Sequence, residues 1–358
     1  MSHKPVRSES CASCGVDECE FNVERRFAGL DFGRHAWLLD EWSAEFNSYL
    51  KNAISGDHEI LTTWPSHLVR KANYAWDIPE FCSVKAAPLV TFRRSLAMRR
   101  LAANGARRQN VMEDFDRRSA EALSAKLAHN VTTMTVWQNF LPFLHLDKTL
   151  GGREYDVLMC RAPRHFLHET LDCAKAHYPE STTLNDFRSS SLLVEAEAAA
   201  LTAARRIVTP HAQLARLYPE KTTLLAWDTT KPNRRRTGER IGFLGPTIGR
   251  RGAYVVRETM RLLGRPLIVI GKNLESENFW QGMQVEQRFF EGDWLHEIGV
   301  LLAPAITEFR PRLILEALAR GTTVIATEAC GLPPRDGLVL VDPYDPAALA
   351  DCLQKAHV

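Results

Sequence analysis

The chain has 358 residues, more than one hydrophobic core usually organises, so we expect two domains. Hydrophobic residues make up 45% of the sequence and charged residues 25%, which indicates a globular protein and excludes a chain dominated by Cys, Pro or Gly. The formal net charge is only +2, no apolar run approaches the roughly 20 residues of a membrane-spanning helix, and the first residues hold no signal-peptide core, so we expect a cytoplasmic protein.

Residues 1–30 are polar and bear cysteines, and we interpret them as a short N-terminal appendage. Cys11, Cys14 and Cys19 lie close enough in sequence to share one metal ion or iron–sulfur cluster. Candidates for a fourth ligand are Cys82, His3 and His35. A reduced segment without metal is the alternative, and we favour it because no fourth ligand is evident from the sequence.

The predicted elements of the first half begin at residue 34. Apolar residues at helical spacing predict a helix over 34–54. The strands predicted after it are 57–65, 87–92, 130–138, 154–163, 205–211 and 221–228. The helices predicted between them are an arginine-rich helix after residue 92, and 113–128, 164–179 and 191–204.

Arginines are clustered in two places. Residues 91–110 contain three Arg-Arg pairs, and residues 231–240 contain an arginine triplet. Such clusters indicate a phosphate-bearing or acidic-lipid partner more than a nucleic-acid groove. A solvated helix face is an equally good interpretation of either cluster alone.

A polar segment at 229–239 separates off a second half in which strands and helices alternate. Its predicted elements are strands at 240–246, 265–271, 322–327 and from residue 338, helices at 253–264, 312–321 and the C-terminal end, and a helix running into a strand at 294–305. Such alternation is typical of parallel βαβ units. We therefore predict an α/β fold with two Rossmann-like, doubly wound domains facing a cleft, residues 31–228 and 229–358, with ligands at the carboxyl ends of the strands.

A glycine-rich turn follows the first strand of the second half. Gly245, Gly249 and Gly252 let the backbone approach a ligand, and the next helix begins directly behind them. A helix N-terminus offers free N–H groups and a partial positive charge, and Arg250 and Arg251 add fixed cations. The sequence therefore predicts an anion site suited to a diphosphate.

Two glutamates, Glu308 and Glu316, stand eight positions apart at the next helix. A carboxylate near a helix N-terminus can accept two hydroxyls at once, as a ribose presents them. A glutamate in a helix is also ordinarily just solvated, and on spacing alone this second interpretation is the better one.

The order of these features resembles one family. Pro304, the two glutamates, the Ala-rich helix ended by Gly321, the strand TTVIAT and the loop ACGLP follow one another as in the nucleotide-binding half of retaining glycosyltransferases of the GT-B fold, the large family-four type group. The resemblance covers roughly residues 240–356 and, more weakly, 193–218.

The resemblance implies a role for particular residues. Glu316 would hold the ribose hydroxyls of a sugar nucleotide, and Glu308 would lie against the transferred sugar or its phosphate. Arg251 would bridge the diphosphate and stabilise the leaving charge, so that Glu308 and Arg251 are the expected catalytic residues. Gly331 would allow close backbone approach to the donor. The expected donor-binding residues are Gly245, Thr247, Arg250, Arg251, Glu308, Arg310, Glu316 and Gly331.

The sequence departs from the family pattern in three places. Pro246 stands where the family has a loop arginine, Pro311 stands where it usually has glycine, and the Gly-Gly loop near the amino terminus has no counterpart. Two alternatives to a glycosyltransferase therefore stay open, a sugar-nucleotide epimerase or hydrolase and a non-catalytic binding protein of the same fold. On the acceptor side, His211 and Trp137 are candidates, with a structural histidine and an interface aromatic as the plainer interpretations.

The expected partners follow from the same resemblance. The first domain would bind a saccharide or lipid-linked acceptor, and the second would bind the nucleotide-sugar, with retention of anomeric configuration. We expect no cofactor for transfer, because arginines and a helix dipole can neutralise a diphosphate. Residues 91–110 could contact an anionic acceptor or the inner face of a membrane, and we expect no nucleic-acid partner.

Overall fold

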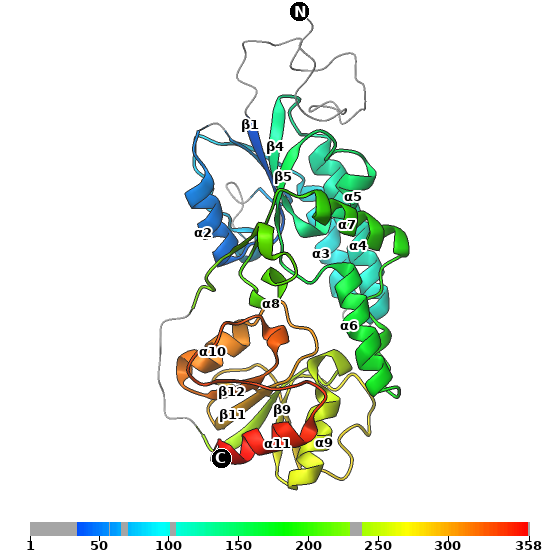
Figure 1. Ribbon diagram of the computed structural model, residues 1–358, viewed down its shortest axis with the longest axis vertical. Coiled ribbons are helices and arrows are strands. Elements are labelled where there is room, and N and C mark those ends of the chain that lie inside the picture. Colours follow the sequence, from blue (N-terminus) through cyan, green and yellow to red (C-terminus); the bar gives the residue numbers. More distant parts are fainter. Residues whose placement is uncertain (1–33, 57, 66–70, 101–104, 230–237, 357–358) are drawn as a thin grey trace, which may run out of the picture. The chain divides into compact units, whose positions relative to one another are not determined.

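The structure, a computed structural model, describes residues 34–56, 58–65, 71–100, 105–229 and 238–356. The chain divides into two compact units (Figure 1). Unit 1 comprises the described residues up to His165, together with Arg188–Pro210 and Leu217–Ala226. Unit 2 comprises Phe166–Phe187, His211–Arg216 and the described residues from Trp227 onward.

Unit 1 is built on a parallel sheet of seven strands. Their order across the sheet is β3 (Ser83–Ala86), β2 (His58–Thr62), β1 (Arg34–Leu39), β4 (Val131–Trp137), β5 (Glu154–Leu158), β6 (Arg206–Thr209) and β7 (Thr222–Leu224). Helix α2 (Ala44–Ala53) covers one face, and α3 (Pro88–Arg100), α4 (Gly105–Ser124), α5 (Leu141–Leu146) and α7 (Ser191–Ala203) cover the other (Figure 1). This is a doubly wound arrangement whose strand order reverses between β1 and β4.

Unit 2 is built on a parallel sheet of six strands. Their order is β10 (Val285–Arg288), β9 (Leu267–Ile270), β8 (Arg240–Leu244), β11 (Ile298–Ala303), β12 (Thr323–Ala326) and β13 (Leu338–Leu340). The helices of this unit are α6 (Arg164–His177, from Phe166), α8 (Ala212–Ala215), α9 (Ala253–Leu263), α10 (Arg312–Arg320) and α11 (Pro346–Lys355). The strand order reverses between β8 and β11.

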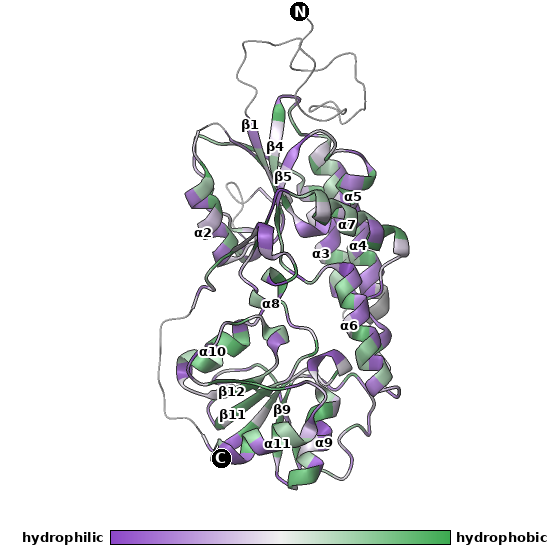
Figure 2. Ribbon diagram, viewed as in Figure 1, coloured by the Kyte–Doolittle hydropathy of each residue, from purple (hydrophilic) through white to green (hydrophobic). Residues whose placement is uncertain are grey.

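Both faces of the unit 2 sheet are buried, which explains why its strands are apolar without alternation. Successive strand residues point to opposite faces. Val300 and Leu302 of β11 therefore pack with residues of α9, α11 and α6, whereas Leu301 and Ala303 pack with residues of α10. Figure 2 shows β9 and β11 coloured as hydrophobic.

Two doubly wound α/β units confirm the fold class predicted from the sequence. In unit 1 the strands predicted at 130–138, 154–163 and 205–211 are β4, β5 and β6. In unit 2 the predicted helices at 253–264 and 312–321 are α9 and α10.

Two predictions in unit 1 are wrong. Residues 34–39 form strand β1 rather than the first turns of a helix. Because β1 is central in the sheet, its side chains Trp37, Leu38 and Leu39 are all buried, and such a run cannot be told from a helix by periodicity. Residues 87–92 belong largely to helix α3, which begins with proline at a position that favours it, and the strand is the preceding β3.

Two features of unit 2 also differ from the prediction. Strand β10 was not predicted, because its sequence VEQR is polar and lies at the edge of the sheet. Residues 294–297, predicted to be helical, form turns that lead into β11.

The units are not contiguous in sequence. The boundary at Ala226 and Trp227 lies close to the one predicted after residue 228. However, residues 166–187 and 211–216, assigned by sequence to the first domain, belong to unit 2. The reason is packing, because Leu171, Ala174 and Tyr178 enter the core of unit 2. The appendage predicted at 1–30 lies outside the described residues.

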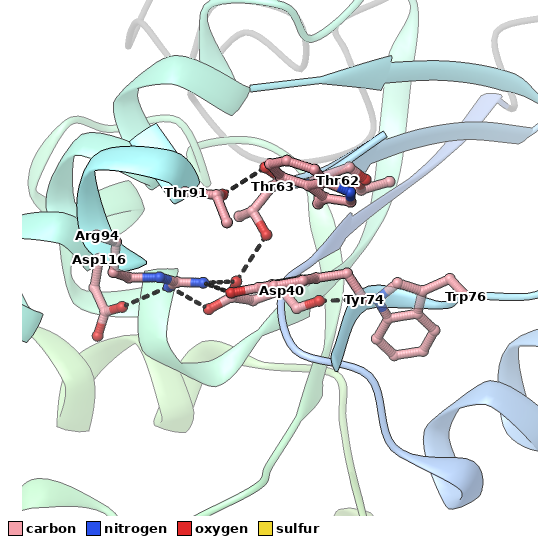
Figure 3. A network of polar contacts seen from close by, with 9 residues as sticks. Asp40, Thr62, Thr63, Tyr74, Trp76, Thr91, Arg94 and Asp116 are labelled. Carbon is pink, nitrogen blue, oxygen red and sulfur yellow. Dashed lines mark hydrogen bonds and ion pairs between the residues drawn. The ribbon is translucent and has the colours of Figure 1, made fainter. Parts of the chain in front are cut away.

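A buried polar network at the carboxyl ends of β1 and β2 anchors helix α3 (Figure 3). The guanidinium of Arg94 donates to both carboxylate oxygens of Asp40, at 2.8 and 2.6 Å, and to the hydroxyl of Tyr74 at 2.8 Å. Asp40 also accepts from the hydroxyl of Thr63 at 2.8 Å, and Asp116 lies 3.7 Å from Arg94. Arg94 is only 3% exposed, so this member of the arginine-rich segment is part of the core.

Candidate functional site

The switch point of the unit 2 sheet brings two loops together. Because β8 and β11 are neighbours and their following helices α9 and α10 lie on opposite faces, a crevice opens between the loops after these strands. The loop after β8 contains Gly249–Arg251, a short 3₁₀ turn, and the loop after β11 contains Glu308. The predicted diphosphate turn and the glutamate expected beside the transferred sugar therefore lie at one edge of one sheet.

The two loops are held together by backbone contacts. The carbonyl of Arg250 accepts hydrogen bonds from the N–H groups of Ile306 at 2.9 Å and Thr307 at 3.3 Å. Gly252 adopts a left-handed φ of +78°, and a Cβ there would lie 2.0 Å from the carbonyl oxygen of Pro304. Only glycine fits this position, so the turn and the Glu308 loop form one rigid piece.

Arg251 and Glu308 form an ion pair at this point. The other carboxylate oxygen of Glu308 accepts from the backbone N–H of Arg310 at 2.9 Å. The Glu308 side chain is only 7% exposed, so its charge needs this compensation, whereas the Arg251 side chain is 23% exposed. The guanidinium of Arg251 is thus a positioned cation beside the carboxylate of Glu308, which the N–H of Arg310 also orients.

A small cavity of 40 Å³ adjoins the pair. It is lined by residues of both loops and of the first turn of α10, namely Leu244, Gly245, Arg251, Glu308, Arg310, Pro311, Leu313 and Ile314. A cavity of this size accommodates a fragment of a ligand rather than a whole nucleotide. The structure thus brings together four residues of the predicted donor set, Gly245, Arg251, Glu308 and Arg310.

Glu316 does not line this cavity. It lies in the second turn of α10, is 37% exposed in its side chain, and sits 3.8 Å from Arg320 one turn further along the helix. Pro311 is the N-cap residue of α10, so it stands between the two glutamates where the chain enters the helix.

Thr247 and Arg250 serve the fold of the loop. Thr247 is buried, donates its N–H to the carbonyl of Lys272 at 2.9 Å and accepts from the indole of Trp280 at 3.1 Å. The guanidinium of Arg250 lies 4.4 Å from the centre of the Phe187 ring. Neither residue lines the cavity beside Arg251.

Three backbone donors of the glycine-rich turn are already engaged within the protein. Gly245 donates to the carbonyl of Ile270 at 2.9 Å, and Arg251 donates to that of Ile248 at 3.1 Å. The N–H of Gly249 donates to the carboxylate of Glu275 at 2.6 Å, so an anion of the protein itself occupies this donor. Sequence reasoning missed Glu275, and no local pattern marks it. These three N–H groups are therefore not available to an external anion, and the side chain of Arg251 lines the cavity beside the turn.

His211, predicted for the acceptor side, is 2% exposed and lies inside unit 2. Its Nδ1 accepts from the N–H of Leu214 at 3.3 Å, which leaves the proton on Nε2. Nε2 then donates toward the carbonyls of Glu308 at 2.8 Å and Ala329 at 3.1 Å. Burial lowers the pKa of His211, although these backbone carbonyls oppose the shift. The neutral ring ties the Glu308 loop to the loop after β12, and this burial does not fit an acceptor contact.

Gly331, in the loop after β12, packs against the same imidazole. It has a left-handed φ of +65°, and a Cβ there would lie 2.3 Å from the His211 ring. Its carbonyl accepts from the N–H of Ala212 at 2.9 Å and from the indole of Trp227 at 3.2 Å. The backbone of Gly331 therefore lies against the His211 ring, whereas the sequence predicts close approach to the donor.

Trp137, the other acceptor-side candidate, is 1% exposed in unit 1. Its ring makes edge-to-face contacts with Phe46 and Trp76, at centroid distances of 5.4 and 6.2 Å. An indole packed in this way belongs to the core and cannot stack on a sugar.

The metal prediction falls on residues outside the described ranges, since Cys11, Cys14 and Cys19 precede residue 34. Within the described part of the chain, no group of three or more His, Cys, Asp or Glu side chains is placed to hold a metal ion. None of the helices described is both long enough and apolar enough to cross a membrane.

Comparison with known proteins finds a family model that matches part of the second unit. Residues 242–357 match the family model described as "Glycosyl transferases group 1". The match confirms the family resemblance predicted from the sequence for residues 240–356.

Solved structures similar to this chain include Alr3699/HepE of Anabaena in complex with UDP and glucose, at 12% identity and a TM-score of 0.47, covering 90% of this chain and 89% of that chain. Another is UGT89C1 of Arabidopsis thaliana complexed with UDP-L-rhamnose, at 8% identity and a TM-score of 0.42, with coverage of 90% and 89%. A comparison with curated protein sequences finds no match.

Proposed function

Since residues 242–357 match the family model "Glycosyl transferases group 1", we propose that the chain transfers a sugar from a nucleotide-sugar donor to a saccharide or lipid-linked acceptor, with retention of anomeric configuration. Unit 2 binds the donor in this proposal, and unit 1 contributes to acceptor binding. The observation that carries the proposal is the Arg251–Glu308 pair at the switch point of the unit 2 sheet, where ligands of parallel α/β sheets bind.

Arg251 supplies the cation for the donor diphosphate. Its side chain is 23% exposed, and its paired carboxylate, Glu308, holds it beside the small cavity. As the bond between sugar and diphosphate breaks, negative charge grows on the leaving phosphate, and a pre-positioned guanidinium stabilises that charge. Glu308 then faces the sugar side. The proposal requires no metal, because this cation is part of the chain.

Glu316 binds the ribose hydroxyls in this proposal. Its carboxylate is more than a third exposed and its ion pair with Arg320 is long, at 3.8 Å, so a ribose diol can compete for it at small cost. The role of Glu316 depends on a donor that reaches from the cavity beside Arg251 to the second turn of α10.

A thermal-shift screen with UDP-, GDP-, ADP- and CMP-sugars tests the proposal. A bound donor raises the melting temperature in proportion to the logarithm of its concentration over its dissociation constant. We expect one nucleotide class to stabilise the chain, and the nucleoside diphosphate to be released only when acceptor extract is added. Release without acceptor would instead indicate a hydrolase, and binding without turnover in any extract would indicate a binding protein.

Helix α3 supports a peripheral contact with an anionic membrane. Leu89, Phe92 and Leu96 are 72, 60 and 44% exposed, and their spacing places them on one face of the helix. Exposed arginines at 93, 99 and 100 flank this face, and α3 contains no acidic residue. Apolar side chains beside arginines are the pattern of a helix that lies in a lipid interface.

Vesicle co-sedimentation tests this contact. We expect binding to vesicles of phosphatidylglycerol and phosphatidylcholine, little binding to phosphatidylcholine alone, and loss of binding in Phe92→Ser. Leu192→Ser is the matched control, because Leu192 is 57% exposed on another helix, α7. Equal binding to both vesicle types, or unchanged binding of Phe92→Ser, would contradict the contact.

A further inference from the structure

A second cavity lies at the same edge of the unit 2 sheet, with a volume of 690 Å³. Its wall is formed by the first half of α6 and by residues that follow β11, β12 and β13. We infer that this cavity binds a neutral or amino-bearing saccharide, which, given the proposed function, is the part of the acceptor that unit 2 contacts.

The charged side chains that line the cavity are all acidic. Glu169, Glu328 and Asp342 line it, and no lysine, arginine or histidine is among its lining residues, all of which are described by the structure. Asp342 uses one carboxylate oxygen to accept from the N–H of Tyr344 at 2.8 Å. Glu328 has an exposed partner, Arg216, at 2.8 Å, and an exposed pair of this kind is weak enough to be replaced.

Three carboxylates select a ligand by its donors. An ionised carboxylate only accepts hydrogen bonds, so it pairs with the hydroxyls of a sugar or with an ammonium group. A phosphate or uronate in the same space would meet like charges, which disfavour it. The cavity thus favours a polyol or an amino sugar over an anionic saccharide.

Aromatic rings supply the second half of saccharide recognition. Tyr344 and Phe166 both line the cavity. The Tyr344 ring is fixed by stacking on His177, with 4.1 Å between ring centres and 16° between planes. Rings presented beside a few polar groups are typical of ligand sites, and a flat apolar ring can cover the C–H face of a pyranose.

The cavity shares its loops with the proposed donor site. Ala305 and Ile306 line the large cavity, and Glu308, two residues further, lines the small cavity beside Arg251. Ala329 lines the large cavity as well. The backbone carbonyls of Ala329 and Glu308 both accept from Nε2 of His211. A saccharide here would therefore contact the loop that carries Glu308 of the proposed donor site, and this step of the inference rests on the proposed function.

Ligand-observed saturation-transfer NMR on the full chain tests the inference, with methyl glucoside, glucosamine and glucuronic acid as probes. We expect glucosamine and methyl glucoside to bind at millimolar concentration and glucuronic acid to bind about tenfold more weakly. Glu169→Gln should weaken the first two, and Glu169→Lys should reverse the preference toward glucuronic acid. Glu195→Gln, an exposed glutamate of α7 in unit 1, removes the same charge and should change nothing.

The inference fails if glucuronic acid binds best to the wild type, if none of the three probes binds, or if Glu169→Lys leaves the order unchanged while the variant melts like the wild type. These outcomes are separate from the donor test. Saccharide binding without nucleotide binding would support the saccharide site and contradict the transferase proposal. Nucleotide binding without saccharide binding would contradict the saccharide site alone.

Discussion

Gly331 shows how a single position fixes the neighbourhood of the candidate site. An alanine there would need a left-handed φ of +65° and would place its Cβ 2.3 Å from the His211 ring, so the imidazole would have to move. We expect Gly331→Ala to lower the free energy of unfolding by about 3 kcal/mol in urea titrations. Gly264→Ala is the matched control, because Gly264 has a φ of +61° with nothing within 4 Å.

The control should cost only about 1 kcal/mol, the price of the left-handed backbone alone. Equal losses in the two variants would mean that the His211 ring moves aside freely and does not hold the loop.

His35 predicts a pH dependence of stability. Its ring nitrogens lie 2.9 Å from the hydroxyls of Thr133 and Thr135, and burial, followed by the nearby His58, lowers its pKa to about 4. Because the unfolded chain binds this proton at a higher pH than the folded chain, the stabilisation is present above pH 6.5 and is lost as the pH falls toward 4.

The loss of unfolding free energy attributable to His35 is about 3 kcal/mol. It is measured as the difference in unfolding free energy between wild type and His35→Gln, followed from pH 7 to pH 4. A variant whose pH profile runs parallel to that of the wild type would contradict the assignment.

At the scale of residues, the sequence predicts which residues lie near one another at the ends of adjacent strands better than it predicts individual hydrogen bonds between distant residues. Arg251 and Glu308 come together because each follows a strand and the two strands are adjacent at the switch point, which strand order alone suggests. The bonds of His211 to two loops and the bond of Glu275 to Gly249 join residues far apart in the chain. No local pattern encodes such contacts.

Helix α3 is an element anchored by the buried ion pair of Arg94 and Asp40, with Asp116 3.7 Å from the same guanidinium. Asp40→Asn would replace both short contacts of the buried Arg94 guanidinium by a neutral amide and leave only Asp116, at 3.7 Å, as its anion. Breaking a buried pair from one side costs about 3 kcal/mol or more. We expect Arg94→Leu to be similarly costly and the double variant to cost less than the sum of the two. A double-mutant cycle in urea measures this coupling, and strict additivity would contradict the pairing.

Elements with a strong period were predicted correctly, and the failures have local causes. The start of α3, with its one proline, and the consecutive apolar residues of β1 each fit two kinds of structure when judged over six residues. Only pairing decides between them, since β1 lies between β2 and β4 in the sheet. The polar edge strand β10 is defined by its partner β9 rather than by its own composition.

At the scale of the whole molecule, the sequence predicted two doubly wound units and a boundary near residue 228. It did not predict that residues 166–187 and 211–216 belong to unit 2. Their apolar residues satisfy helical spacing in either unit, and only the packing of Leu171, Ala174 and Tyr178 beside α9 and α11 assigns them. This interleaving gives unit 2 the wall of its larger cavity and the histidine that ties its loops.

The central claim is that Arg251, held by Glu308, binds the diphosphate of a nucleotide-sugar. Calorimetric titration of UDP, GDP, ADP and CDP into the wild type and Arg251→Ala tests it most directly, with Arg261→Ala of α9, which is exposed, as the control. We predict that one nucleotide binds and that Arg251→Ala weakens it about 30-fold, the equivalent of about 2 kcal/mol for one charge-assisted contact, while Arg261→Ala binds as the wild type does. Unchanged binding in Arg251→Ala, or no binding of any nucleotide to the wild type, would contradict the account.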